Sequence, residues 1–157
     1  MQAQVAVDPQ KVLDSLAAHI AILDENGTIV QVNRAWNYCF SRRLKGLSCV
    51  GSENREADAP PPPSASIGAN YLNVCRNTQG REAPYAQAVL QGLEDVLAGR
   101  QDEFNFIYRC AWPVEVLEFL LTATPLPGGG AVISHQEIPP QLNRAAPKPA
   151  EPAHASA

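Results

Sequence analysis

A β-hairpin near the N-terminus constrains the fold more than any other feature of the sequence. Residues 19–23 (His-Ile-Ala-Ile-Leu) and 28–32 (Thr-Ile-Val-Gln-Val) are rich in β-branched and apolar side chains. Residues 24–27 between them read Asp-Glu-Asn-Gly, and Asn and Gly tolerate the positive φ angles of a tight turn. The two strands are therefore predicted to pair as antiparallel neighbours.

A helix is predicted on each side of this hairpin. Asp8 can act as N-cap of the first, and Pro9 suits its first helical position. Helical spacing of apolar residues then continues to about residue 18. Asn33 is placed to cap a second helix over residues 34–40, directly after the hairpin.

Two more helical segments follow a long irregular stretch. Residues 67–76 indicate one or two short turns, with Ile67, Tyr71 and Cys75 recurring at spacing four. A longer helix is predicted from about Pro84 to Gly99, where glycine is a natural terminator. The apolar residues of this helix form one stripe: Ala86, Val89, Leu90, Leu93, Val96 and Leu97.

Three strands are predicted to close the domain, over residues 103–110, 116–124 and 131–136. In the first of them the bulky side chains alternate, which places them on one face: Phe104, Phe106, Tyr108 and Cys110. Two strands and then three, separated by helices, do not alternate as parallel βαβ units would. The order predicts an α+β fold with a five-stranded antiparallel sheet and helices packed on one face.

Low-complexity stretches set the predicted domain boundaries. Four consecutive prolines, residues 60–63, cannot continue a helix or a central strand, so residues 41–66 are expected to form a surface insertion. Residues 139–157 are rich in Ala, Pro and Glu and are expected to be a disordered tail. We therefore expect a flanking amphipathic helix over 1–18 and one domain over 19–138.

Composition narrows the class of protein. The net charge of −4 argues against nucleic-acid binding, which needs a surplus of Lys and Arg on one face. No apolar run approaches the ~20 residues that span a bilayer, and the N-terminus does not resemble a secretory signal. The four cysteines are widely spaced and lack a C-x-x-C pair, so we expect reduced thiols and a cytoplasmic protein.

Three segments, in this order, resemble bacterial PAS sensor domains. Residues 22–36 are similar to the first hairpin and following helix of that family, with its D-x-x-G-x-I-x-x-x-N-x-A pattern. Residues 67–75 (Ile-Gly-Ala-Asn-Tyr-Leu-Asn-Val-Cys) resemble the I-G-x-N-Y-L-x-V-C segment of one bacterial subgroup. Residues 124–126 with 129–135 resemble the closing hairpin of the same subgroup. The resemblance implies a five-stranded antiparallel sheet that cradles helices around a small interior space.

The resemblance also implies a signalling role, with one departure from the pattern. PAS sensors usually end in an Asp-Ile-Thr signature that leads into an output domain, whereas Gln136-Glu137-Ile138 here runs into Pro139-Pro140. We therefore expect an output in trans, through a partner such as a histidine kinase or regulator in a two-component system, or else a domain that has lost its output.

A ligand site could be built from the aromatic residues. The candidate residues for a ligand pocket are Trp36, Phe40, Tyr71, Leu72, Phe104, Phe106, Ser134 and His135. Large aromatics also dominate ordinary cores, so simple core packing is the alternative. His135 is a candidate haem ligand, or else a strand residue bonded to its neighbour. The identity of any cofactor stays open, and flavin photochemistry is disfavoured because Cys75-Arg76 lacks the flavin motif around it.

Catalytic motifs do not emerge from the sequence. Ser134 and His135 are adjacent, so strand alternation points them to opposite faces and prevents a nucleophile–base contact. No close ligand pairs typical of a metal site are present. We expect a non-enzymatic sensor that binds a ligand, with a ligand-free interaction module or a remnant of a longer sensor kinase as alternatives. A homodimer is expected through the first helical segment, whose apolar residues are Val5, Val7, Val12, Leu13 and Leu16.

Overall fold

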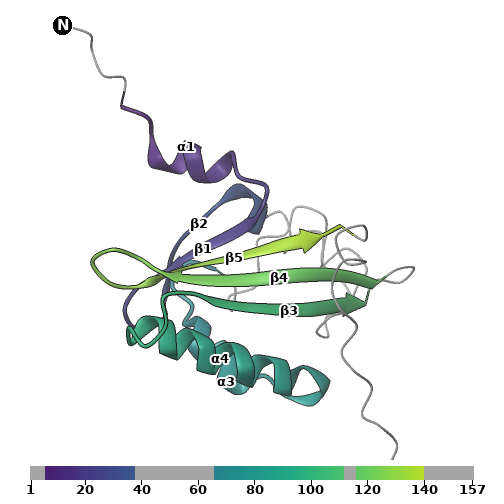
Figure 1. Cartoon of the computed structure of the whole chain (residues 1–157). Helices are drawn as coiled ribbons and strands as arrows, with labels where there is room; N and C mark the ends of the chain where they lie inside the picture. Colours follow the sequence, from purple (N-terminus) through teal and green to yellow (C-terminus); the bar gives the residue numbers. More distant parts are fainter. Residues whose placement is uncertain (1–5, 38–65, 112–115, 140–157) are drawn as a thin grey trace, which may run out of the picture.

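The predicted strands form one antiparallel sheet in the computed structural model, which describes residues 6–37, 66–111 and 116–139. The order across the sheet is β2-β1-β5-β4-β3, so the N-terminal hairpin joins the C-terminal strand (Figure 1). The strands are β1 (His19–Leu23), β2 (Ile29–Val32), β3 (Phe104–Ala111), β4 (Val116–Pro125) and β5 (Ala131–Ile138). This is the predicted α+β architecture, with strand limits that differ from the expected ones by at most two residues.

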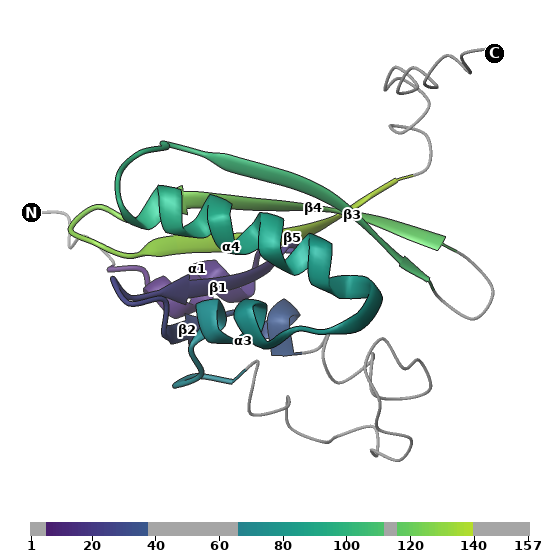
Figure 2. The same ribbon diagram turned by 90° about the horizontal axis from the view of Figure 1, so that it is seen from below.

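The helices lie on both sides of this sheet. Helices α3 (Tyr71–Asn77) and α4 (Ala83–Leu97), with the 3-10 turn η2 (Gly80–Glu82) between them, cover one face, as Figure 2 shows. The short helix α1 (Pro9–Asp14) lies on the other side, beyond β1 and β2. Residues 34–37 are helical, as expected after Asn33. We call the face covered by α3 and α4 the inner face.

The first hairpin closes through the side chain of Asp24. Its Oδ1 accepts hydrogen bonds from the backbone N–H groups of Asn26 (2.9 Å) and Thr28 (2.9 Å). Gly27 has φ 84°, a conformation that glycine adopts without strain. The Asp-Glu-Asn-Gly turn is therefore confirmed, and its geometry follows from the residues that predicted it.

Helix α1 is shorter than expected. It begins at Pro9 with Asp8 as N-cap, as predicted, but ends at Asp14 instead of near residue 18. Ser15 closes it, with the hydroxyl donating to the carbonyl of Val12 at 2.7 Å. The carbonyls that follow are taken up by a side chain from outside the helix, described below, and none of the residues of α1 is buried.

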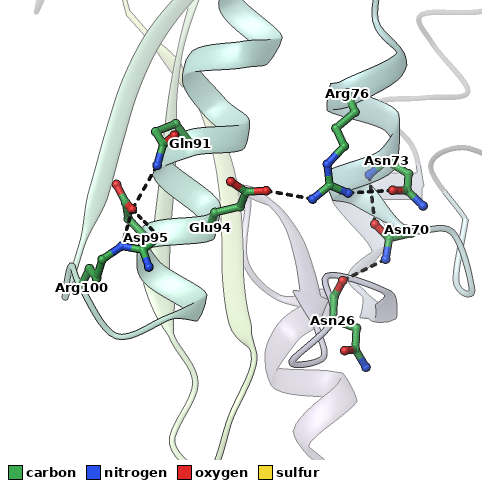
Figure 3. Close-up of polar contacts among 8 residues, drawn as sticks. All are labelled: Asn26, Asn70, Asn73, Arg76, Gln91, Glu94, Asp95 and Arg100. Atoms are coloured by element: carbon green, nitrogen blue, oxygen red, sulfur yellow. Dashed lines mark hydrogen bonds and ion pairs between the residues drawn. The ribbon is translucent and has the colours of Figure 1, made fainter.

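Helix α4 confirms its predicted apolar stripe. Val89, Leu90, Leu93 and Val96 are buried, while Ala86 and Leu97 pack partly buried against the same core. Gly99, at φ 75°, follows the C-terminus as expected, and the N–H of Arg100 bonds to the carbonyl of Asp95. The Arg100 guanidinium also contacts the Asp95 carboxylate at 2.7 Å (Figure 3).

One helical expectation was wrong. Ile67 does not share a helix face with Tyr71 and Cys75, because α3 begins at Tyr71 and Ile67 is 63% exposed. The preceding residues instead bond to the first hairpin: Ile29 N–H donates to the Ala69 carbonyl, and Tyr71 N–H to the Gly27 carbonyl. Asn70 then caps α3 by accepting from the Asn73 N–H (Figure 3). Residues 67 and 68 do form a turn, closed by the bond from the Ala69 N–H to the Ser66 carbonyl, but the extended backbone of Asn70 separates this turn from α3.

The expected insertion at 41–66 and tail at 139–157 lie outside the described residues, apart from Ser66 and Pro139. The domain boundaries therefore remain predictions. Within the part of the chain that the structure describes, no helix is long and apolar enough to cross a membrane.

Candidate functional site

Strand register decides which candidate residues share the inner face. His135 on β5 pairs with His19 on β1 and with Leu121 on β4, so these three side chains project from one side of the sheet. Ser134 pairs with Ile20 and Thr122 and projects from the opposite side. The prediction that Ser134 and His135 face opposite ways is confirmed. The proposed place of Ser134 in a ligand pocket beside His135 was wrong, since period-two alternation separates them.

His135 is the centre of a group of polar aromatic side chains on the inner face. Its Nδ1 lies 2.8 Å from the hydroxyl of Tyr108, on β3. Its Nε2 lies 3.4 Å from the hydroxyl of Tyr71, the first residue of α3. Each hydroxyl can donate or accept a hydrogen bond, so the pair suits either tautomer of the imidazole.

Trp36 supplies the apolar wall of the same group. Its side chain is 1% exposed, and its ring centroid lies 5.6 Å from that of His135 and 6.3 Å from that of Tyr71. We call Trp36, Tyr71, Tyr108 and His135 the inner-face cluster. It draws on β3, β5, α3 and the helical residues after the hairpin.

Two further rings, those of Phe119 and His19, lie beside the inner-face cluster. Phe119 on β4 stacks on Tyr108, with centroids 5.4 Å apart and planes 15° apart. The ring of His19 lies 6.2 Å from that of Phe119. The candidate set omitted Tyr108, Phe119 and His19. Tyr108 was recognisable as an inward residue from strand alternation, but only the register brings it to His135.

The other candidate residues pack elsewhere. Phe104 and Phe106 stack on each other at the α4 side of the sheet, with centroids 6.3 Å apart. Leu72 is buried against the first hairpin, where a Cβ on Gly27 would lie 2.6 Å from its Cγ. These three residues support the core-packing interpretation. Phe40 lies outside the described residues.

Haem ligation by His135 does not fit this arrangement. An axial ligand must present one imidazole nitrogen to the iron, whereas both nitrogens of His135 face tyrosine hydroxyls. No group of three or more His, Cys, Asp or Glu residues that could hold a metal ion occurs within the described residues.

Cys75 behaves as a core residue. It is 7% exposed on α3, among Leu72 and the buried residues of α4. Burial raises the pKa of its thiol to about 11, and the nearby charge of Arg76 only partly offsets this. The thiol is therefore protonated at neutral pH, the form that is a poor nucleophile.

A chain of polar contacts links the outer surfaces of α3 and α4. Arg76 bonds both to Asn73 on its own helix, at 2.8 Å, and to Glu94 on α4, at 2.8 Å (Figure 3). Asn70 extends the chain by donating to the carbonyl of Asn26 in the first hairpin at 2.9 Å. The Arg76–Glu94 pair is solvent-exposed, so its contribution to stability is modest, about 0–1 kcal/mol.

Comparison with known sequences yields one informative relative. No protein-family model matches the chain. An uncharacterised 104.1 kDa protein from the hypE 3′ region of Rhodobacter capsulatus is 35% identical over 133 residues. The match covers 82% of this chain but 12% of that protein, so the chain corresponds to a small part of its relative.

Comparison with solved structures gives the fold. The PAS domain of Bordetella pertussis BvgS is similar, with a TM-score of 0.53 at 13% identity, covering 86% of this chain and 87% of that one. The Vibrio cholerae VqmA dimer, described as a LuxR-type receptor, has a TM-score of 0.52 at 16% identity, covering 88% of this chain and 53% of that one. The chain has a PAS fold, while the resemblance of residues 67–75 to one subgroup remains a prediction.

Proposed function

We propose that this PAS-fold chain is a non-enzymatic, cytoplasmic signal-sensing module that binds a small ligand at the inner-face cluster. The observation that carries the proposal is the pairing of both His135 nitrogens with tyrosine hydroxyls beside the buried Trp36 ring. Small-molecule sites are mostly apolar, with a few placed polar groups that orient the ligand. Three such groups meet here, each on a different element: Tyr71 on α3, Tyr108 on β3 and His135 on β5.

The proposed output is a change in association with a signalling protein, such as a histidine kinase or regulator acting in trans. The PAS fold supports a signal-sensing role in general, and VqmA of similar fold is described as a receptor. Ser134 faces away from His135, so the two residues do not form a nucleophile–base pair.

A second candidate function is a ligand-free module that dimerises or docks onto a partner. The exposed apolar side chains of α1 and its flanks favour it: Val7 is 66% exposed, Val12 48% and Leu16 45%. Leu13 is only half-buried, and Val5 lies outside the described residues. This candidate needs no ligand at the inner-face cluster.

Native mass spectrometry and an absorbance scan of freshly purified protein separate the two candidates, followed by a thermal-shift screen of small metabolites. A ligand at 100 times its Kd stabilises the fold by about 2.7 kcal/mol, which shifts Tm by several degrees. We expect this shift in the unmodified chain and in Ser134→Ala, but not in His135→Leu. Ser134→Ala is the matched control because it lies on the opposite face of the same strand. Absence of any bound mass and of any stabilising compound would leave the ligand-free candidate.

A further inference from the structure

Asn33 lies at a junction between the sheet, the inner-face cluster and helix α1. Its side chain is fully buried, at 0% exposure, directly after β2. A buried amide must satisfy both its oxygen and its nitrogen, because an unpaired polar group in the interior costs about 1–3 kcal/mol. The two ends of this amide bond to different parts of the molecule.

The oxygen of the Asn33 side chain bonds to the part of the chain that carries the inner-face cluster. Oδ1 accepts from the backbone N–H of Trp36 and from that of Ile20, each at 3.0 Å. The first bond caps the helical residues that carry Trp36, and the second ties the amide to β1. A shift of the Trp36 backbone therefore pulls on the Asn33 amide.

The nitrogen of the same side chain donates hydrogen bonds to carbonyls at the C-terminal end of α1 and just after it. Nδ2 donates towards the carbonyls of Ala18 (2.8 Å), Leu13 (3.0 Å) and Leu16 (3.3 Å). Three carbonyls share the two N–H groups of this nitrogen, so both α1 and its connection to β1 are bonded to the Asn33 amide. Because the amide is rigid and planar, its oxygen and nitrogen cannot move independently.

We propose that Asn33 couples the inner-face cluster to helix α1, so that a change around His135 and Trp36 alters how firmly α1 is held. The proposal does not require a ligand, because it concerns the coupling between two parts of the fold. Three further contacts attach α1 without Asn33. Gln10 Nε2 donates to the Val32 carbonyl at 3.0 Å, Gln31 Nε2 donates to Gln10 Oε1 at 2.6 Å, and Arg34 N–H donates to Asp14 Oδ1 at 2.7 Å. They provide the control.

Native-state amide hydrogen exchange of the full chain tests the coupling, read at residues 13–18 of the α1 end. His135→Leu perturbs the cluster without touching α1. We expect it to change exchange at the α1 end about fivefold or more, which is the lower range of measured coupling. In an Asn33→Ser background, His135→Leu should change the exchange rates of residues 13–18 less than twofold. Ser can still cap the Trp36 N–H, but it is too short to reach the α1 carbonyls.

The matched control is Asp14→Ala, which loosens α1 while leaving the Asn33 amide intact. In that background, His135→Leu should still change the exchange rates of residues 13–18 fivefold or more. An equal effect of His135→Leu in the Asn33→Ser and unmodified backgrounds, or no effect at the α1 end in either, would overturn the proposal.

A second measurement keeps the test decisive if Asn33→Ser does not fold. Across His135→Leu, Tyr71→Phe and Tyr108→Phe, the exchange rates of the Ile20 and Leu16 amides should rise or fall together, while that of Thr122 on β4 stays within twofold. Independent variation of the Ile20 and Leu16 rates would equally overturn the coupling. Failure here would leave ligand binding at the cluster unaffected, because binding is measured by mass and thermal shift.

Discussion

At the scale of single residues, Gly92 lies where helix α4 packs against Phe104 of β3. A Cβ at this position would lie 2.4 Å from ring carbons of Phe104, well inside van der Waals contact. Glycine within a helix costs about 1 kcal/mol relative to alanine, so only close packing explains its presence. The missing side chain is what allows α4 to lie against β3.

We therefore expect Gly92→Ala to lower the free energy of unfolding, against its helix propensity. Overpacking costs about 1–3 kcal/mol and the propensity gain is about 1 kcal/mol, so a net loss of up to about 2 kcal/mol is expected. Urea denaturation measures it. Gln91→Ala, at an exposed position of the same helix, should change stability by about 0.5 kcal/mol or less. A more stable Gly92→Ala would show that Phe104 moves aside.

The buried thiol of Cys75 makes the free energy of unfolding depend on pH in the alkaline range. Burial raises the pKa of its thiol from 9.0 to about 11, so between these values the folded protein keeps a proton that the unfolded chain releases. Its contribution to stability is therefore complete below pH 9 and falls as pH rises towards 11. At pH 10.5 the expected loss is about 2 kcal/mol.

Comparison with Cys75→Ala isolates this effect, because every other titratable group is common to the two proteins. Urea denaturation at pH 8 and pH 10.5 should show a larger loss for the unmodified chain than for Cys75→Ala. Equal losses would mean that the thiol is not desolvated in the folded state.

At the scale of elements, helix α1 is held to its own domain mainly by polar contacts. Gln10, Asp14 and the Asn33 amide bond it to the end of β2, while its own residues remain unburied. A six-residue helix is not stable alone in water, so its exposed apolar side chains favour a second packing partner. A second copy of this chain is the proposed partner.

We expect replacement of Val7, Val12 and Leu16 by Ser to convert a dimer into a folded monomer. The polar contacts of α1 use none of these side chains, so the sheet should remain intact. Deleting residues 1–17 would be less clean, because it removes two of the three carbonyls that Asn33 binds. Sedimentation equilibrium measures the association state, and Val30→Ser, at an exposed apolar position of β2, is the control. An unmodified chain that is monomeric at high micromolar concentration would contradict the dimer.

At the scale of the whole molecule, β5 joins the two halves of the chain. It lies between β1 and β4 in the sheet, so the N-terminal hairpin reaches β3 and β4 only through the last strand. The pairing of β1 with β5 closes a loop that contains most of the chain, which costs chain entropy, whereas β4 and β5 form a local hairpin.

We expect a chain ending at Gly130 to lose cooperative unfolding altogether, not merely to lose one strand. Circular dichroism during thermal and urea denaturation measures this. A chain ending at Pro139, which lacks only the tail that composition predicts to be dispensable, should unfold as the full chain does. A cooperative transition in the shorter chain would show that one half of the sheet folds alone.

The sequence by itself determined the local elements and, through its resemblance to PAS domains, the fold. Asp24 to Gly27 carry the turn chemistry of the first hairpin, and the apolar stripe of α4 carries its buried face. These features are set by residues within a few positions of one another, so spacing and turn preferences predict them. The same reasoning failed at residue 67 and at the end of α1, where contacts with distant residues override local spacing.

Only the tertiary structure decided the candidate site. Strand alternation showed that Ser134 and His135 face opposite ways, but not which of them meets the helices. The bonds of His135 join residues 27 and 64 positions away, and those of the Asn33 side-chain nitrogen reach back 15 to 20 positions. The reason is physical: periodicity determines which residues of one element share a face, whereas strand register and helix packing determine which faces meet.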